Sequence, residues 1–142
     1  MENKITFTSK TMITTKLGEQ LPKFKIEQGN DCYTISCFNK KKQKYHNKLL
    51  SEIYIVDHLD YLFEHDPDRI QRYLDNGKLY KYLLDIHVTA VLTVDRQMEK
   101  WKKTDREYLI AKEKRDIIEK ARILNNMQAR AEEIMYPCVI YA

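Results

Sequence analysis

The densest run of residues that could carry chemistry is a basic one, at residues 40–44. Four lysines fall within five positions, so the segment could contact phosphates through its ammonium groups, and a neighbouring aromatic ring could stack on a base. No zinc finger, recognition helix or RNA-binding signature accompanies the run, and a solvated loop leading into a helix is the alternative interpretation. The candidate nucleic-acid-binding residues are Lys40, Lys41, Lys42, Lys44 and Tyr45.

A second possible chemistry is metal binding, because His58 and His65 lie seven positions apart in a segment rich in aspartate. Such residues could hold a divalent metal in a metal-dependent enzyme. The sequence lacks the helical metal motif with His and Glu three or four positions apart, and it lacks a glycine-rich phosphate loop and a nucleophile elbow. We therefore expect no catalytic residue, no metal site and no cofactor, and we expect that the protein is not an enzyme.

The cysteines are three in number, Cys32, Cys37 and Cys138, and none forms a CxxC pair or another zinc-ligand spacing. Cysteine behaves as a small apolar residue and is usually buried. We expect free, buried or half-buried thiols and no disulfide.

The composition suits a soluble globular protein, with 43% hydrophobic and 32% charged residues among 142. No run of 18 apolar residues exists and the first residues do not resemble a signal peptide, so we expect a cytoplasmic protein without membrane contact. The charge is unevenly spread: residues 1–48 carry ten basic against four acidic side chains, and residues 49–76 carry two against seven. We expect a single domain over 1–142, with a β-rich basic part over 1–45 and a helical part over 46–142.

The amino-terminal part shows the alternation that is typical of strands. Residues 4–8 alternate apolar and hydroxyl side chains, and a turn cluster at residues 28–31 lies between two further alternating segments. These patterns predict a short strand over 4–8 and a β-hairpin over 23–38. Residues 11–21 have no clear period, so we expect a loop there.

The remaining chain has helical periodicity, which predicts helices over 47–65 and 67–75 and two long helices over 78–103 and 105–135. The long helices are expected to separate at a capping box of Thr104 and Glu107, although one unbroken helix is the alternative. Pro137 should end the second long helix, and the apolar, β-prone tail over 138–141 should pack back onto the fold. Heptad spacing predicts that this helix buries Ile110, Ile117, Leu124 and Ala131, together with Ala121, Met127 and Ile134.

The fold class that follows is mainly α (α+β). A long antiparallel helical hairpin would be its main feature, accompanied by one or two shorter helices and a small N-terminal β-hairpin.

Two blocks of sequence resemble a known family. The first comprises residues 61–65, 77–80 and 83–86, and the second comprises residues 125–127, 130–134 and 140–141. Together they resemble the TnpV family, whose members are encoded on transposons. The resemblance covers about residues 61–141, and it implies a small bacterial accessory protein of a mobile element with no established enzymatic activity. The motif residues are Gly77, Lys78, Leu79, Tyr80, Ala131, Glu132, Glu133, Ile134 and Tyr141.

The function expected from these features is that of a non-catalytic accessory protein of a bacterial mobile genetic element that binds DNA or RNA through its basic amino-terminal region. The alternative is a protein-binding module that inhibits or regulates a host or element-encoded protein, for example a defence nuclease. A homodimer formed through apolar side chains left outside the core, such as Tyr80, Leu84 and Val91, is also compatible with the sequence.

Overall fold

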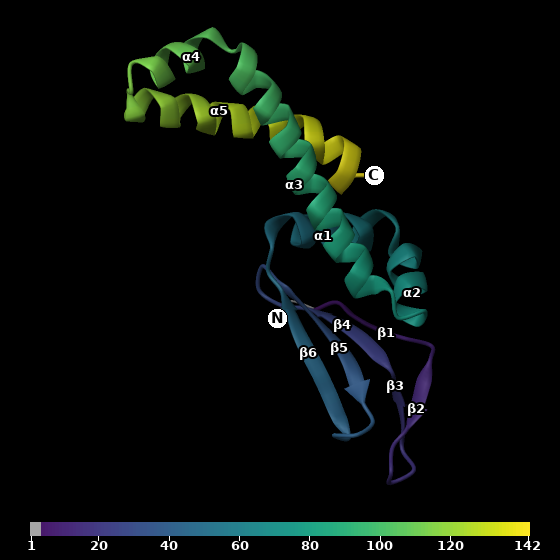
Figure 1. Cartoon of the computed structure of the whole chain (residues 1–142). Coiled ribbons are helices and arrows are strands. Elements are labelled where there is room, and N and C mark those ends of the chain that lie inside the picture. Colours follow the sequence, from purple (N-terminus) through teal and green to yellow (C-terminus); the bar gives the residue numbers. More distant parts are fainter. Residues whose placement is uncertain (1–3) are drawn as a thin grey trace. The chain divides into compact units, whose positions relative to one another are not determined.

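In the computed structural model, which describes residues 4–142, six strands precede all the helices (Figure 1). The strands are β1 (Thr6–Thr8), β2 (Met12–Thr14), β3 (Gln20–Pro22), β4 (Phe24–Gln28), β5 (Tyr33–Asn39) and β6 (Lys44–Leu50). Four of them form an antiparallel sheet in the order β1-β4-β5-β6, and β2 and β3 pair separately. The chain divides into two compact units, Met1–His87 and Val88–Ala142, and the sheets belong to the first.

The central β4–β5 hairpin follows directly from the sequence. Ile26 of β4 faces Ile35 of β5, and alternation places both in the core. In the turn the Gly29 amide donates to the Cys32 carbonyl over 2.8 Å, while Asp31 has a φ of 54°. Aspartate tolerates this left-handed geometry better than most residues do. The predicted hairpin over 23–38 and the predicted strand over 4–8 are confirmed.

Helices cover one face of the four-stranded sheet in the first unit. They are α1 (Ile53–His65), α2 (Pro67–Asp75) and the first part of α3 (Leu79–Thr104). Their buried leucines and isoleucines, among them Leu59, Ile70 and Leu83, form one core with Ile26, Ile35 and Leu50 of the sheet. Burial of these apolar side chains is the main stabilising contribution to the unit.

The second unit is helical and has its own small core. It comprises the rest of α3, then α4 (Arg106–Glu113), α5 (Ile117–Met135) and the π-helical turn η1 (Tyr136–Ile140). Its core contains Tyr108, Ala111, Ile123 and Met127, with Met98, Trp101 and Leu124 packed around them. Among residues 4–142, no helix combines the length and the apolarity that crossing a membrane requires.

The predicted fold class, with a long antiparallel helical hairpin and only a small N-terminal β-hairpin, is wrong. Within residues 4–142 the strands make a four-stranded sheet and a separate two-stranded one, and five α-helices follow them. The expected loop over 11–21 contains β2 and β3, whose three residues each are too few to show alternation. Residues 44–50, expected as a loop and a helix start, form β6 because they pair with β5 along its whole length.

The predicted helix over 105–135 is two helices, because the chain turns at Arg115, which has a φ of 55°. Asp116 then caps α5 by accepting a hydrogen bond from the Glu119 amide over 3.1 Å. The break rotates the helical faces, so the predicted heptad stripe is only partly buried. Ile117 is 80% exposed and Ile134 is 48% exposed, and the buried face of α5 consists instead of Ile123, Met127, Ala131 and Met135.

The ends of the other helices agree more closely with the sequence. The separation near residue 104 is confirmed, but the capping residue is Asp105, whose carboxylate accepts from the Tyr108 amide over 2.8 Å. The Thr104 hydroxyl instead donates to the Lys100 carbonyl. α5 ends at Met135, two residues before Pro137. The tail is a π-helical turn and not a strand, yet Ile140 is fully buried, as expected of a tail that packs back.

We expect Tyr33 to make the stability of the first unit sensitive to alkaline pH. Its hydroxyl donates to an Asp60 carboxylate oxygen, and burial, followed by this hydrogen bond, raises the pKa of Tyr33 well above its ordinary value. In the unfolded chain the phenol ionises near pH ~10. Because the folded pKa is raised, the stabilising contribution is complete below that pH. Above that pH the contribution decreases by about 1.4 kcal/mol per pH unit.

We therefore expect the stability advantage of the wild type over Tyr33→Phe to shrink above pH ~10. Urea unfolding at a series of pH values, followed by circular dichroism, measures this advantage. An advantage that stays constant from neutral pH upward to about one unit above pH ~10 would contradict the assignment.

Candidate functional site

The lysines predicted from the sequence lie at the tip of the β5–β6 hairpin, which we call the lysine hairpin (residues 39–45). Residues 40–43 form the turn, and Lys44 begins β6. The four lysine residues are all exposed. The structure thus gathers Lys40, Lys41, Lys42 and Lys44 at one projecting end of a β-ribbon.

The backbone of this tip is held by side chains of the hairpin itself. The Asn39 side-chain oxygen accepts from the amides of Lys41 and Lys42, over 3.0 and 3.2 Å. Gln43, with a φ of 53°, donates through its amide nitrogen to the Lys40 carbonyl over 2.6 Å. The Gln43 oxygen accepts from the Lys16 amide over 3.0 Å, which ties the tip to the β2–β3 turn. These bonds occupy backbone groups and leave the lysine ammonium groups available.

The charge of the lysine hairpin is not neutralised locally. Within residues 4–142 the ion pairs involve other cations, namely Arg69, Lys102 and Arg122, and no carboxylate lies within ion-pair distance of the four hairpin lysines. Like charges at one tip repel one another, so an anionic partner would relieve that repulsion as well as bind.

Tyr45, the fifth predicted residue, makes several contacts with neighbouring strands. Its hydroxyl donates to the Pro22 carbonyl over 2.7 Å, and burial raises the pKa of this hydroxyl. The Lys25 ammonium lies 4.1 Å from the ring centroid, and Phe38 meets the ring edge-on. One face of the ring is therefore already covered, and the lysines remain the accessible part of the predicted set.

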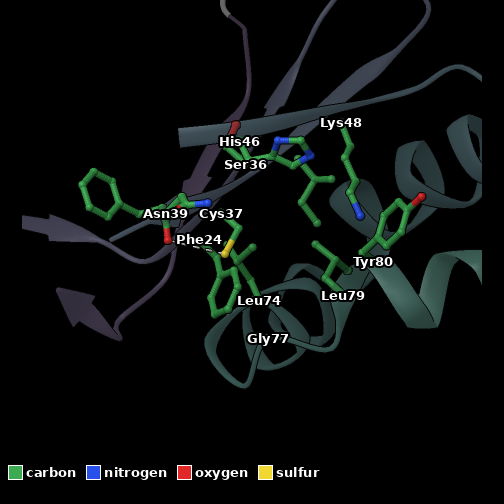
Figure 2. Close-up of a pocket in the computed structure, with 12 residues that line it drawn as sticks. Phe24, Ser36, Cys37, Asn39, His46, Lys48, Leu74, Gly77, Leu79 and Tyr80 are labelled. Carbon is green, nitrogen blue, oxygen red and sulfur yellow. Dashed lines mark hydrogen bonds between the residues drawn. The ribbon is translucent and has the colours of Figure 1, made fainter. Parts of the chain in front are cut away.

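A cavity of about 460 Å³ opens beside the same hairpin (Figure 2). β4, β5 and β6 contribute one wall, and the end of α2, the following turn and the start of α3 contribute the other. Ile35, Leu74 and Leu79 make part of the lining apolar, and Lys48 and His46 add polar groups. Sequence reasoning did not identify a cavity here, because its lining comes from separate segments of the chain, although three family-motif residues, Gly77, Leu79 and Tyr80, are part of that lining.

Several reactive or cationic side chains meet at this cavity. The Lys48 ammonium lies 4.0 Å from the ring centroid of Tyr80, and His46 lies directly across from Cys37 in the strand register. Cys37 is exposed, and so is Cys138, so the expectation of buried or half-buried thiols is wrong for these two cysteines. The thiol of Cys37 faces the cavity, because odd-numbered side chains of β5 such as Ile35 share that side of the sheet.

The motif residues of the family resemblance divide between the two units. Gly77, Leu79 and Tyr80 line the cavity, while Lys78 is exposed and directly precedes α3, with its amide donating to the Tyr73 carbonyl. The other motif residues belong to the second unit: Ala131 is buried, Glu132 accepts from Gln128, Glu133 and Ile134 are exposed, and the ring of Tyr141 lies 5.5 Å from that of Tyr136.

The histidines weighed as metal ligands have separate partners. His58 is buried, with its Nε2 atom 2.8 Å from the Tyr82 hydroxyl. His65 is exposed, stacks on Tyr61 and has its Nδ1 atom 3.0 Å from the Tyr61 carbonyl. In the part of the chain that the structure describes, no three histidine, cysteine or acidic side chains are grouped as metal ligands would be.

Comparison with known proteins identifies the family. The family model of the transposon-encoded protein TnpV matches residues 26–140. The match therefore extends beyond the resemblance over 61–141 and includes most of the sheet, the lysine hairpin and nearly all of the cavity lining. Neither the curated proteins nor the solved structures give a significant match. Because the matched segment spans most of its 142 residues, the chain belongs to the TnpV family of transposon-encoded proteins.

Proposed function

We propose that this member of the TnpV family is a non-catalytic accessory factor of a bacterial mobile element, and that it binds nucleic acid through the lysine hairpin. The observation that supports the proposal is the set of four exposed lysines on a hairpin tip whose backbone is already hydrogen-bonded. Each ammonium group would contact a phosphate and release a condensed counterion. A tip held in place loses little conformational entropy on binding.

Contacts of this kind carry no sequence information, so the expected binding is sequence-independent and strongly dependent on salt. Four phosphate contacts give a slope of about −3.6 in a plot of log affinity against log salt concentration for duplex DNA. Between about 50 and 200 mM salt, the affinity should therefore fall on the order of 100-fold.

Fluorescence anisotropy of a labelled duplex and a labelled single strand tests the proposal. The variant in which Lys40, Lys41, Lys42 and Lys44 are all changed to alanine should bind both weakly, and its salt slope should be reduced by about 3 to 4. The matched control changes Lys100, Lys103, Lys112 and Lys114 to alanine. These four lysines are exposed on α3, α4 and the residue after α4, so the net charge changes equally.

The control variant should keep most of the affinity and most of the slope. Equal losses in the two variants would show that net charge alone is responsible, which would overturn the assignment to the lysine hairpin. Failure of the wild-type protein to bind either nucleic acid at low salt would remove the proposed function.

The second candidate function, binding to a host or element-encoded protein, is favoured by exposed apolar side chains in the helical unit. Ile117 and Ile118 at the start of α5 are 80% and 84% exposed, and Leu109 and Ile110 of α4 are each 42% exposed. Exposed apolar residues that cluster on a soluble protein often mark an interaction site. Such binding would be insensitive to the lysine substitutions and only weakly dependent on salt.

A further inference from the structure

The cavity beside the lysine hairpin has the composition of a site for a flat, partly apolar group that is attached to an anion. Its volume of about 460 Å³ lies within the range of small-ligand sites. Three aromatic residues, Phe24, Phe38 and Tyr80, belong to its lining, and Lys48 supplies a positive charge. No carboxylate occurs among the lining residues in the described part of the chain, so an anion would meet no like charge there.

This cavity adjoins a second hollow on the lysine hairpin. The second hollow measures about 330 Å³ and is lined by residues of the hairpin and of β6, including Lys42 and Lys44. Asn39 and His46 line both hollows. A ligand could therefore place a ring in the first hollow and negative charges along the second, and a nucleotide chain has this combination.

We propose that the cavity takes one unstacked nucleobase of a single-stranded nucleic acid, with the adjoining phosphates held by Lys48 and by Lys42 and Lys44. The inference rests on the proposed function, because it requires binding of nucleic acid through the lysine hairpin. It adds the class of nucleic acid, since a single strand presents unstacked bases whereas a duplex must first extrude one, at a cost of a few kcal/mol. The protein is thus expected to prefer single strands.

The test fills the cavity without changing the charge. Cys37 is exposed on the cavity wall, so Cys37→Phe places a ring where the base would lie, and aromatic residues are generally favoured in strands. Loss of one stacked base should weaken binding of a labelled single strand about tenfold. Duplex affinity and the salt slope should be unchanged, because the phosphate contacts remain.

The matched control is Cys138→Phe, the same substitution at an exposed cysteine of the other unit. It should alter neither the affinity for the single strand nor the affinity for the duplex. A single strand whose central nucleotides lack bases should bind the wild type as weakly as the intact strand binds Cys37→Phe. If Cys37→Phe does not fold, as judged by circular dichroism, His46→Phe fills the same cavity from β6.

The outcomes separate the two proposals. If the wild type binds the single strand, and neither Cys37→Phe nor removal of the bases weakens that binding, the nucleobase site is overturned and the lysine hairpin remains supported. Equal loss of single-strand and duplex binding in a folded Cys37→Phe variant also overturns the nucleobase site. Absence of any binding by the wild type at low salt overturns both.

Discussion

Replacement of Leu83 by alanine is expected to lower the free energy of unfolding by about 2–5 kcal/mol. Leu83 lies in α3 with no exposed surface, within the core that joins the sheet to α1 and α2. The substitution removes buried methyl and methylene groups and leaves a cavity that neighbouring side chains fill only in part. Urea unfolding followed by circular dichroism measures the change.

The matched control is the neighbouring residue, Leu84, which has the same side chain on the same helix but is 38% exposed. Leu84→Ala should change the stability by about 0.5 kcal/mol. Similar losses in the two variants would contradict the burial assigned to α3. A loss in Leu84→Ala that depends on protein concentration would instead support a homodimer through Tyr80, Leu84 and Val91, which is compatible with the sequence.

Replacement of Gly77 by alanine is expected to destabilise the protein by about 2–4 kcal/mol, for two separate reasons. Gly77 has a φ of 74°, which costs a residue with a Cβ atom about 1–2 kcal/mol. An added Cβ atom would also lie 2.8 Å from the Cζ atom of Phe24, so the ring of Phe24 would have to move. Thermal or urea unfolding measures the total loss of stability.

Gly18→Ala separates these two contributions, because Gly18 has a φ of 85° and a Cβ atom added there would meet no other atom within 4 Å. Gly18→Ala should lower the free energy of unfolding by about 1–2 kcal/mol, the contribution of the backbone conformation alone. Addition of Phe24→Leu to Gly77→Ala should recover part of the stability that is lost through the contact with the ring, and a double-mutant cycle measures this recovery. Equal losses at Gly77 and Gly18 would show that contact with Phe24 is unimportant.

The local signals in the sequence were sufficient for several elements. α2 occupies residues 67–75 as predicted, because Pro67 suits the first helical position and Gly77 supplies the positive φ after the helix. The β4–β5 hairpin is likewise found where alternation places it, and the helical period of α3 is seen in the burial of Leu79, Leu83 and Ala90. In each case the decisive residues are within a few positions of one another.

Elements whose own residues show no clear or correct period were missed. β6 shows no clear alternation, because an edge strand with exposed lysines and polar side chains on both faces needs no apolar period. β2 and β3 pair over only three residues each. The break before α5 had a local signal, Asp116 followed by Glu119, but the heptad spacing across it was interpreted as one continuous helix.

Three properties of this chain follow from the order of its amino acids: four lysines in five positions, membership of the TnpV family and a periodic helical second half. The position of those lysines on a hydrogen-bonded β-hairpin, with a cavity beside them, emerges only when the chain is folded. The cavity joins a strand residue, Phe24, to the turn at Gly77, more than fifty positions away. Contacts at that separation depend on the packing of sheet against helix, which no local pattern of residues specifies.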